Sequence, residues 1–292
     1  MKQKSTETLF FNIFAIAFTT LFAVLCIIPI LLTLAGSFTP EQELLRGLKL
    51  IPDHFTTDAY KLVMRDPSAM LNAYGVTIRL VVIGTALSLF ITTMTAYVLY
   101  RKDFPARNFF AFFFFFTTLF SGGLVPHYVW LSELGLRNTF TVLLTGSLFT
   151  VFNMIIVRSY FTGNIPQSLV ESAKIDGAGD FRIYHSIVLP SAGPIIATVG
   201  LLTALAYWNN WQAAMIYITN SKLYPLQYYL YRVFQEAAQQ AQLSEVGQGG
   251  GVTPTESYKL AMTVFTMGPV ILFYPFVQKY FVTGVTVGAV KE

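Results

Sequence analysis

The chain has 292 residues, of which 54% are hydrophobic and only 12% are charged, and its formal net charge is +4. An average soluble domain carries about 25% charged residues, so this composition favours a membrane protein whose apolar surface is covered by lipid. The lysines and arginines are spread over several loops instead of forming a patch, which argues against a nucleic-acid-binding protein.

Six stretches are long and apolar enough to cross a bilayer as helices. A span needs about 20 mostly apolar residues, because a helix rises about 1.5 Å per residue across about 30 Å of hydrocarbon. The predicted spans are Phe11–Ala35, Val76–Leu99, Phe109–Trp130, Phe140–Tyr160, Ile195–Ile218 and Leu260–Phe281. The sequence therefore predicts an all-α, polytopic membrane protein with six transmembrane helices.

The first stretch has some features of a signal peptide, because Lys2 and Lys4 precede it and small residues follow it. Its apolar run is longer than the roughly 7–15 residues of a signal-peptide core, so we expect a retained signal anchor. We predict that residues 1–72 form this anchor and an extracellular segment. Residues 73–292 then form the transmembrane core.

The distribution of basic residues predicts the orientation of the spans. Arg101, Lys102 and Arg107 share one short loop, whereas the short loop at Ser132–Asn138 holds only Arg137. Short loops that are rich in lysine and arginine stay in the cytoplasm. Both termini are therefore expected in the cytoplasm, and the long segments 38–71 and 219–258 outside the cell.

A polar segment, Gly163–Pro194, lies between the fourth and fifth predicted spans on the cytoplasmic side. Ser168 and Glu171 have the spacing of a capping box, which predicts that a helix starts there. Gly177 and Gly179 are expected to end this helix with positive φ angles.

A second short helix is predicted over Phe181–Val188. Asp180 is expected to cap its start, and Pro190 and Pro194 to stop it before the fifth span. The two helices form a helix–turn–helix that is suited to docking into a groove on a soluble partner.

The same segment resembles the EAA loop of ABC importer permeases. Its signature is E-A-A, three residues, G, nine residues and I-x-L-P, and the spacing here agrees throughout, with a serine in place of the first alanine. The matching residues are Glu171, Ser172, Ala173, Asp176, Gly177, Ile187, Leu189 and Pro190. The resemblance implies that this segment is a coupling helix held in a cleft of a separate ATPase.

Four shorter motifs occur in the order of the same family. Residues 134–139 resemble the L-G-L-x-N-T of maltose-type, MalG-like permeases, and residues 120–126 resemble the F-S-G-G-L-x-P of a branch associated with aldouronate and other polysaccharide fragments. The tail 284–291 is similar to G-x-x-x-G-A-V-K. Residues 208–211 resemble W-N-D-F but depart from it at Asn210 and Trp211.

The resemblance implies a type I ABC importer permease that moves sugars or oligosaccharides by alternating access. The expected partners are a cytoplasmic ABC ATPase dimer, a second homologous permease subunit, an extracellular solute-binding (lipo)protein and membrane lipid, with no nucleic acid. The expected location is the bacterial plasma (inner) membrane. No cofactor is expected on this chain, and ATP and Mg are expected on the ATPase.

The candidate residues have alternative roles. Glu171 can cap its own helix and offer a carboxylate to a basic groove, and Asp176 can bond locally or contact the partner. The possible translocation-path residues are Trp208, Asn209, Asn210 and Trp211. The amides can instead join helices by hydrogen bonds, and the indoles can pack against protein or lie in the interfacial belt. The glycine-rich tip of the 219–258 segment can meet a binding protein or serve as a flexible loop.

The sequence holds no constellation that is typical of an enzyme. We find no G-x-x-x-x-G-K-[ST] phosphate loop, nucleophile motif or carboxylate pair within a span. The single cysteine, Cys26, and three widely separated histidines predict no metal site. An ion-coupled secondary transporter would require ionisable residues in mid-span or inverted repeats, and neither is evident. The remaining alternative is an ABC permease for another polar solute.

Overall fold

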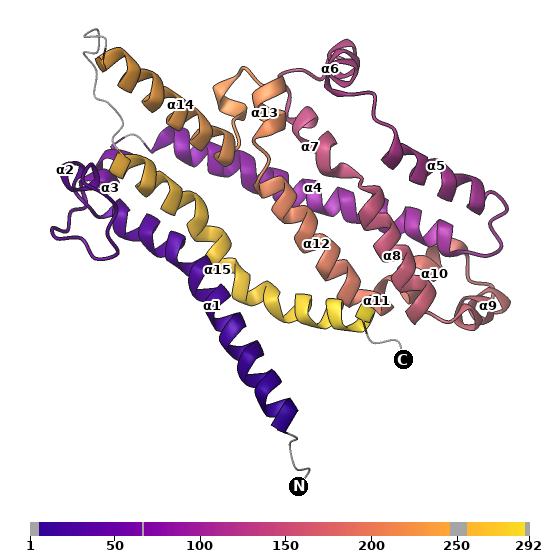
Figure 1. Ribbon diagram of the computed structural model, residues 1–292. Helices are drawn as coiled ribbons and strands as arrows, with labels where there is room; N and C mark the ends of the chain where they lie inside the picture. Colours follow the sequence, from indigo (N-terminus) through magenta and orange to yellow (C-terminus); the bar gives the residue numbers. More distant parts are fainter. Residues whose placement is uncertain (1–5, 66, 246–255, 290–292) are drawn as a thin grey trace. The chain divides into compact units, whose positions relative to one another are not determined.

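The computed structural model describes residues 6–65, 67–245 and 256–289, and every regular element within them is helical. This confirms the predicted all-α class. The elements are α1 (Thr6–Ser37), α2 (Glu41–Leu44), α3 (Asp58–Val63), α4 (Ser68–Tyr100), α5 (Arg107–Leu119), α6 (Leu124–Glu133), α7 (Phe140–Leu148), α8 (Val151–Asn164), α9 (Gln167–Ile175), α10 (Asp180–Ile183), the π-helix η1 (Tyr184–Val188), α11 (Leu189–Ser191), α12 (Gly193–Trp208), α13 (Gln212–Tyr217), the 3₁₀-helix η2 (Ser221–Leu223), α14 (Leu226–Glu245) and α15 (Glu256–Ala289) (Figure 1).

The chain forms two compact units. One consists of residues 1–67 and 232–269, and the other of residues 68–231 and 270–292. The division of the chain at residue 72 into anchor and core stays a prediction.

In the first unit, α1 is a long apolar helix whose side chains are mostly exposed, as expected of a helix surrounded by lipid. Its C-terminal end is fixed by polar and aromatic contacts. The hydroxyls of Ser37 and Tyr60 are 2.7 Å apart, and the Tyr60 ring stacks on Phe38 and meets the edge of Phe265 in α15. The carboxylate of Glu41 accepts hydrogen bonds from the first residues of α15.

The second unit is built around α4, against which α12, α8 and α7 pack (Figure 1). Small residues allow the closest approach between α4 and α12. A side chain at Gly84 would meet the ring of Tyr207, and one at Gly200 would meet Leu89. The Tyr207 hydroxyl donates to the carbonyl of Leu144, so α12 is also fastened to α7. These contacts make α4 and α12 a tightly packed pair.

Three of the predicted spans are not single straight helices. The third breaks at residues 120–123, where Gly123 has a φ of +84°, and α5 and α6 meet there at an angle of 115°. The fourth breaks at Phe149 and Thr150, both with extended backbone, and the fifth at residues 209–211. A local turn signal within an apolar run explains the first break, and hydropathy alone does not reveal it.

Among the described residues, α1 and α4 are long and apolar enough to cross a membrane unbroken. Two bent pairs, α5 with α6 and α10–α11 with α12, pass the same test of length and composition together. The number of six transmembrane helices therefore stays a prediction.

Candidate functional site

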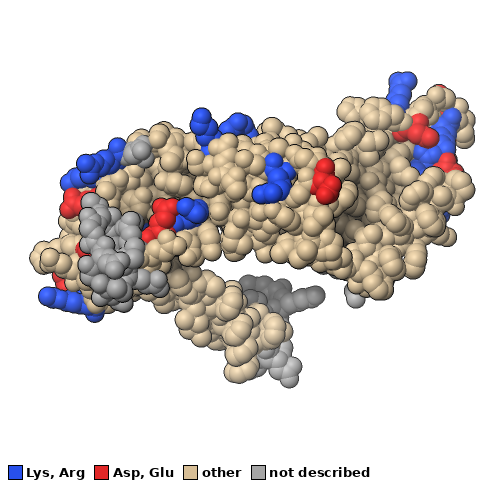
Figure 2. Space-filling view, turned by 90° about the horizontal axis from the view of Figure 1, so that it is seen from above, with Lys and Arg blue, Asp and Glu red and all other residues tan. Residues whose placement is uncertain are grey.

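The segment that carries the EAA signature folds as four consecutive helical pieces, α9, α10, η1 and α11. We call residues 167–191 the α9–α11 segment. It lies at one end of the second unit (Figure 1), and acidic and basic side chains lie next to one another on the surface there (Figure 2). The predicted helix–turn–helix is therefore present.

The start of α9 differs from the predicted capping box. Pro166, with extended backbone, occupies the N-cap, and no side chain caps this helix. The helix begins at Gln167, and the carbonyl of Pro166 accepts its first hydrogen bond, from the amide of Leu169. Ser168 therefore lies inside the first turn, and the predicted capping roles of Ser168 and Glu171 are wrong.

The end of α9 is a Schellman motif around Gly177. The Gly177 amide donates to the carbonyl of Lys174 at 2.9 Å, and the Ala178 amide donates to the carbonyl of Ala173 at 2.9 Å. Gly177 has a φ of +78°, as predicted. Gly179 does not, because its φ is −69°. Only Gly177 is therefore required by the backbone of this turn.

The second helix also differs from its prediction. Gly179 is its N-cap, and Asp180 is its first residue and makes no capping bond, because its carboxylate binds elsewhere. Pro190 does not stop it. Pro190 lies in the first turn of α11, where a proline is tolerated, and the bend of 85° into α12 follows Ser191.

The α9–α11 segment has a buried face and an exposed face. Val170 and Ala173 are buried in the core, and Ile187 and Leu189 pack against that core. The exposed face includes the remaining signature residues, Glu171, Ser172, Asp176, Gly177 and Pro190. It also includes large apolar side chains, since Ile175 is 87% exposed and Phe181 is 62% exposed.

An ion cluster that the sequence reading missed holds this segment. The buried guanidinium of Arg101 donates two hydrogen bonds to Asp103, at 2.8 and 2.6 Å, and a third to Asp180 at 2.8 Å. It also donates to the Tyr97 hydroxyl at 2.6 Å. Lys174 in α9 binds the same Asp103 carboxylate. We call Arg101, Asp103, Lys174 and Asp180 the ion cluster.

The charges in the ion cluster strengthen one another. Hydrogen bonds from Arg101 and Lys174 hold the pKa of Asp103 well below its usual range. The hydrogen bond to Asp103, together with that to Asp180, raises the pKa of Arg101 further above neutrality, against the effect of burial. Arg101 and Asp103 are therefore both charged at neutral pH. In the sequence, two members of the cluster, Arg101 and Asp103, lie in the basic loop at 101–107, which by itself predicts only the orientation of the spans.

Residues 208–211 form the break between α12 and α13. The Asn210 side chain donates to the carbonyl of Leu143 in α7 at 3.0 Å, and the Asn209 side chain donates to the carbonyl of Leu205 in its own helix. Trp211 stacks on Tyr231 with the ring centroids 5.1 Å apart. The indole nitrogen of Trp208 is buried and has no hydrogen-bond partner among the described residues. The geometry thus joins Asn210 to a neighbouring helix, and the role of these residues in the translocation path stays a prediction.

The part of the chain that the structure describes holds no group of three or more histidine, cysteine or carboxylate residues that could bind a metal ion. The chemistry of the site consists instead of an exposed helix face and an ion cluster behind it. Apolar helices of this length, with a polar helical segment at one end, indicate a membrane protein.

The comparisons with known proteins agree with this class. A family model described as "Binding-protein-dependent transport system inner membrane component" matches residues 3–287. The chain belongs to this family.

Relatives and a solved structure narrow the class. The chain is 38% identical to the polygalacturonan/rhamnogalacturonan transport system permease protein YtcP of Bacillus subtilis, over 96% of this chain and 98% of that protein. It is 27% identical to the arabinooligosaccharides transport system permease protein AraQ of Halalkalibacterium halodurans, over the full length of both. A crystal structure of a bacterial ABC transporter involved in the import of the acidic polysaccharide alginate matches 96% of this chain and all of that chain, with a TM-score of 0.82 and 30% identity. The chain is therefore the permease component of a binding-protein-dependent ABC sugar importer.

Proposed function

We propose that this permease translocates oligosaccharides by alternating access and that a separate ATPase drives it by holding α9. The observation that carries the proposal is the exposed face of the α9–α11 segment. Ile175 and Phe181 are largely exposed there, next to the carboxylates of Glu171 and Asp176. A large apolar side chain in water is stabilised by a partner that covers it, and the exposed charges of both signs around it, such as Glu171 and Lys174, can pair with charges on that partner.

The proposed arrangement follows from the predicted topology. The termini, the 101–107 loop and the α9–α11 segment face the cytoplasm, where ATP is bound by the partner. The segment at 219–258 faces outward, where a solute-binding protein delivers the sugar. A second, homologous permease subunit completes the pore. Residues 208–211 are candidates for the pore lining, because Asn209 and Trp211 keep exposed surface.

We propose acidic polysaccharide fragments as the substrate class. Two similar proteins support this choice, because the name of YtcP specifies polygalacturonan and rhamnogalacturonan, and the solved transporter imports alginate. The name of AraQ specifies arabinooligosaccharides, so a neutral oligosaccharide is the natural comparison.

Cross-linking tests the docking surface directly. In a Cys26→Ser background, an Ile175→Cys variant is expected to form a cross-link to the co-expressed ATPase through a short thiol-to-amine reagent. Asn220→Cys, which is also exposed but predicted to lie outside the cell, is the control and is expected to give none. Absence of the Ile175→Cys product together with intact sugar uptake would refute the docking role.

Substrate-stimulated ATP turnover tests the substrate class. The complete transporter in proteoliposomes, with its binding protein, is expected to hydrolyse ATP faster with oligogalacturonates than without sugar. Arabinooligosaccharides of equal length are expected to stimulate it much less. The reverse order of stimulation would overturn the acidic-substrate proposal and leave the docking proposal intact.

A further inference from the structure

Hydrogen bonds and ring contacts join the C-terminal end of α4 to the chain just before α9 and to η1 in the α9–α11 segment. The Tyr100 hydroxyl donates to the carbonyl of Ile165 at 2.9 Å, just before α9 begins. The Thr93 and Tyr184 hydroxyls are 2.8 Å apart, which joins α4 to η1. The rings of Tyr97 and Tyr184 also meet, with centroids 5.5 Å apart. These contacts join residues that are distant in sequence.

The ion cluster adds charged bonds to α9 and α10 at the same place. Asp103 follows α4 by three residues and binds Lys174 in α9, while Arg101 binds Asp180 in α10. The Arg101 side chain is only 7% exposed, whereas the Asp103 and Asp180 side chains are 52% and 70% exposed, so only the guanidinium side of each bond is shielded from water. Hydrogen bonds between ionised groups are about twice as strong as neutral ones.

The chain connections of α9 are less suited to transmit force. Before α9, Ile165 and Pro166 have extended backbone. After α9, the turn at residues 176–179 has left-handed Gly177 at its centre. Neither joint is helical, so neither continues the axis of α9 into the next element. The ion cluster bridges the second joint directly, because Lys174 lies before it and Asp180 lies after it.

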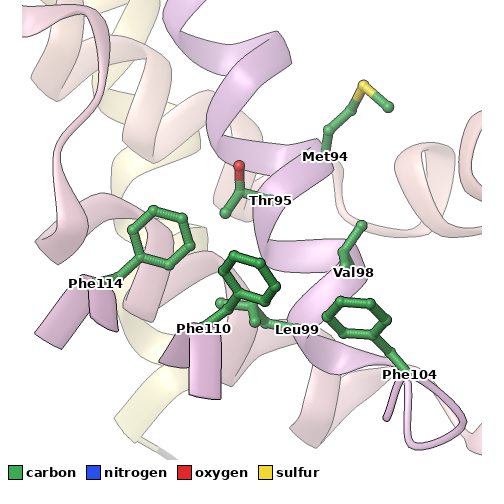
Figure 3. A pocket seen from close by; sticks show the side chains of 7 residues that line it. All are labelled: Met94, Thr95, Val98, Leu99, Phe104, Phe110 and Phe114. Atoms are coloured by element: carbon green, nitrogen blue, oxygen red, sulfur yellow. The ribbon is translucent and has the colours of Figure 1, made fainter. Parts of the chain in front are cut away.

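The opposite face of α4 is loosely packed at the same level. A pocket of about 280 Å³ lies between α4, α5 and the loop that joins them. Figure 3 shows the side chains that line it, which are Met94, Thr95, Val98, Leu99, Phe104, Phe110 and Phe114. Most of its lining is apolar, with no charged group. The end of α4 is thus held by polar bonds on the side of the α9–α11 segment, whereas an apolar pocket separates it from part of α5 on the other side.

We propose that the ion cluster is the connection through which movement of α9 is transmitted to α4, and from α4 to the tightly packed α12. Its four members act as positioning residues, because they bind one another and so hold the docking helix against the end of α4. The inference rests on the proposed docking of an ATPase at α9. It adds that α4, which is distant from α9 in sequence, moves together with it.

The test measures sugar uptake and ATP turnover in the same proteoliposomes, made with the complete transporter. Asp180→Asn and Lys174→Met are expected to keep ATP turnover but to lower the sugar transported per ATP by roughly five-fold or more. Asp180→Glu and Lys174→Arg keep the charges and are expected to retain most of the coupling. Asp58→Asn removes an exposed ion pair with Lys61 in the other unit and is the matched control, expected to behave as wild type.

The Ile175→Cys cross-link separates this inference from the docking proposal. In the Asp180→Asn and Lys174→Met variants the cross-link to the ATPase is expected to persist while uptake per ATP falls. Unchanged uptake per ATP in both variants would overturn the role of the ion cluster. Loss of the cross-link would overturn it as well, because the cluster would then be needed only to fold the docking surface. Failure of the cross-link in the otherwise unchanged chain would refute the docking proposal itself.

Discussion

Turn residues explain the motif at residues 134–139 position by position. Gly135, with a φ of +70°, ends α6 in a Schellman motif like that of Gly177. Asn138, with a φ of +57°, accepts hydrogen bonds from the amides of Thr219 and Asn220. The Thr139 hydroxyl caps α7 by accepting a hydrogen bond from the amide of Val142. The L-G-L-x-N-T residues therefore shape the chain between α6 and α7.

Replacing Gly177 tests whether the turn after α9 depends on its backbone. Gly177→Ala is expected to lower the free energy of unfolding by about 1 kcal/mol, because alanine is strained at positive φ although there is open space for its side chain. Gly179→Ala is the control, since its φ is ordinary and its surroundings are equally open. Thermal unfolding in detergent measures both, and equal effects would contradict the assignment.

A substitution at Gly84 tests the close packing of α4 on α12. A β-carbon there would lie 2.5 Å from the Tyr207 ring, which is too close. Gly84→Ala is expected to destabilise the protein by about 1–3 kcal/mol, as in overpacked cores. Gly146→Ala in α7 has open space and is expected to be neutral or stabilising, because alanine favours helix. A melting temperature for Gly84→Ala at or above that of Gly146→Ala would contradict the packing.

The pH dependence of stability tests the charge state of Asp103. A carboxyl whose pKa is lowered by folding stabilises the folded state above its ordinary pKa of about 3.9, and this contribution is lost as the pH falls through the lowered value. The difference in melting temperature between wild type and Asp103→Asn is therefore expected to be the same at pH 7 and pH 5 and to shrink only in stronger acid. A difference that disappears between pH 7 and pH 5 would contradict the ion cluster.

At the scale of residues, backbone conformations set by local sequence could be predicted, and contacts between residues distant in sequence could not. The positive φ of Gly177 follows from glycine in a short turn. The bonds of Arg101 to Asp180 and of Lys174 to Asp103 join positions 79 and 71 residues apart, and no local pattern reveals such pairs. The capping box failed because Pro166, with its fixed φ, started the helix two residues earlier than Ser168 could.

At the scale of elements, the proposed docking of the ATPase depends on the exposed face of α9. Its inner face, Val170 and Ala173, is buried, so substitutions there act on folding. Its outer face carries Ile175, which has little to contact within this chain. Effects on ATPase binding should therefore arise from the outer face alone.

A charge on this face is expected to weaken docking. Ile175→Asp is expected to lower the amount of ATPase that copurifies by roughly ten-fold or more, because it removes apolar surface from the proposed interface and buries a charge there. Ile51→Asp is the control, because Ile51 is 81% exposed but lies in the segment predicted to be outside the cell. Equal loss of ATPase in both variants would contradict the docking surface.

The long helices were easier to predict than the broken ones. α1, α4 and α15 contain the first, second and last predicted spans, although α1 contains Pro29 and α15 contains Gly268 and Pro269. The third span contains Gly122 and Gly123, and the fifth contains Asn209 and Asn210, where the helix ends. Hydropathy averages over such residues, so it predicts where the chain is apolar better than where a helix is continuous.

At the scale of the whole molecule, the family membership and the helical fold describe the permease component of an ABC sugar importer. The described residues provide an exposed face on α9, a charged connection between the α9–α11 segment and α4, and the packing of α4 on α12. Under the proposed docking, these parts carry movement from a separate ATPase to the helices around the sugar pathway.

The most direct test is uptake of radiolabelled oligosaccharide into proteoliposomes that hold this chain and its partner permease, with the binding protein present, either with or without the ATPase. The account predicts uptake only when the ATPase and ATP are both present. It also predicts that Gly177→Trp, which disturbs the turn behind the docking helix, lowers uptake while the ATPase remains able to hydrolyse ATP. Uptake against a concentration gradient without any ATPase would contradict the account.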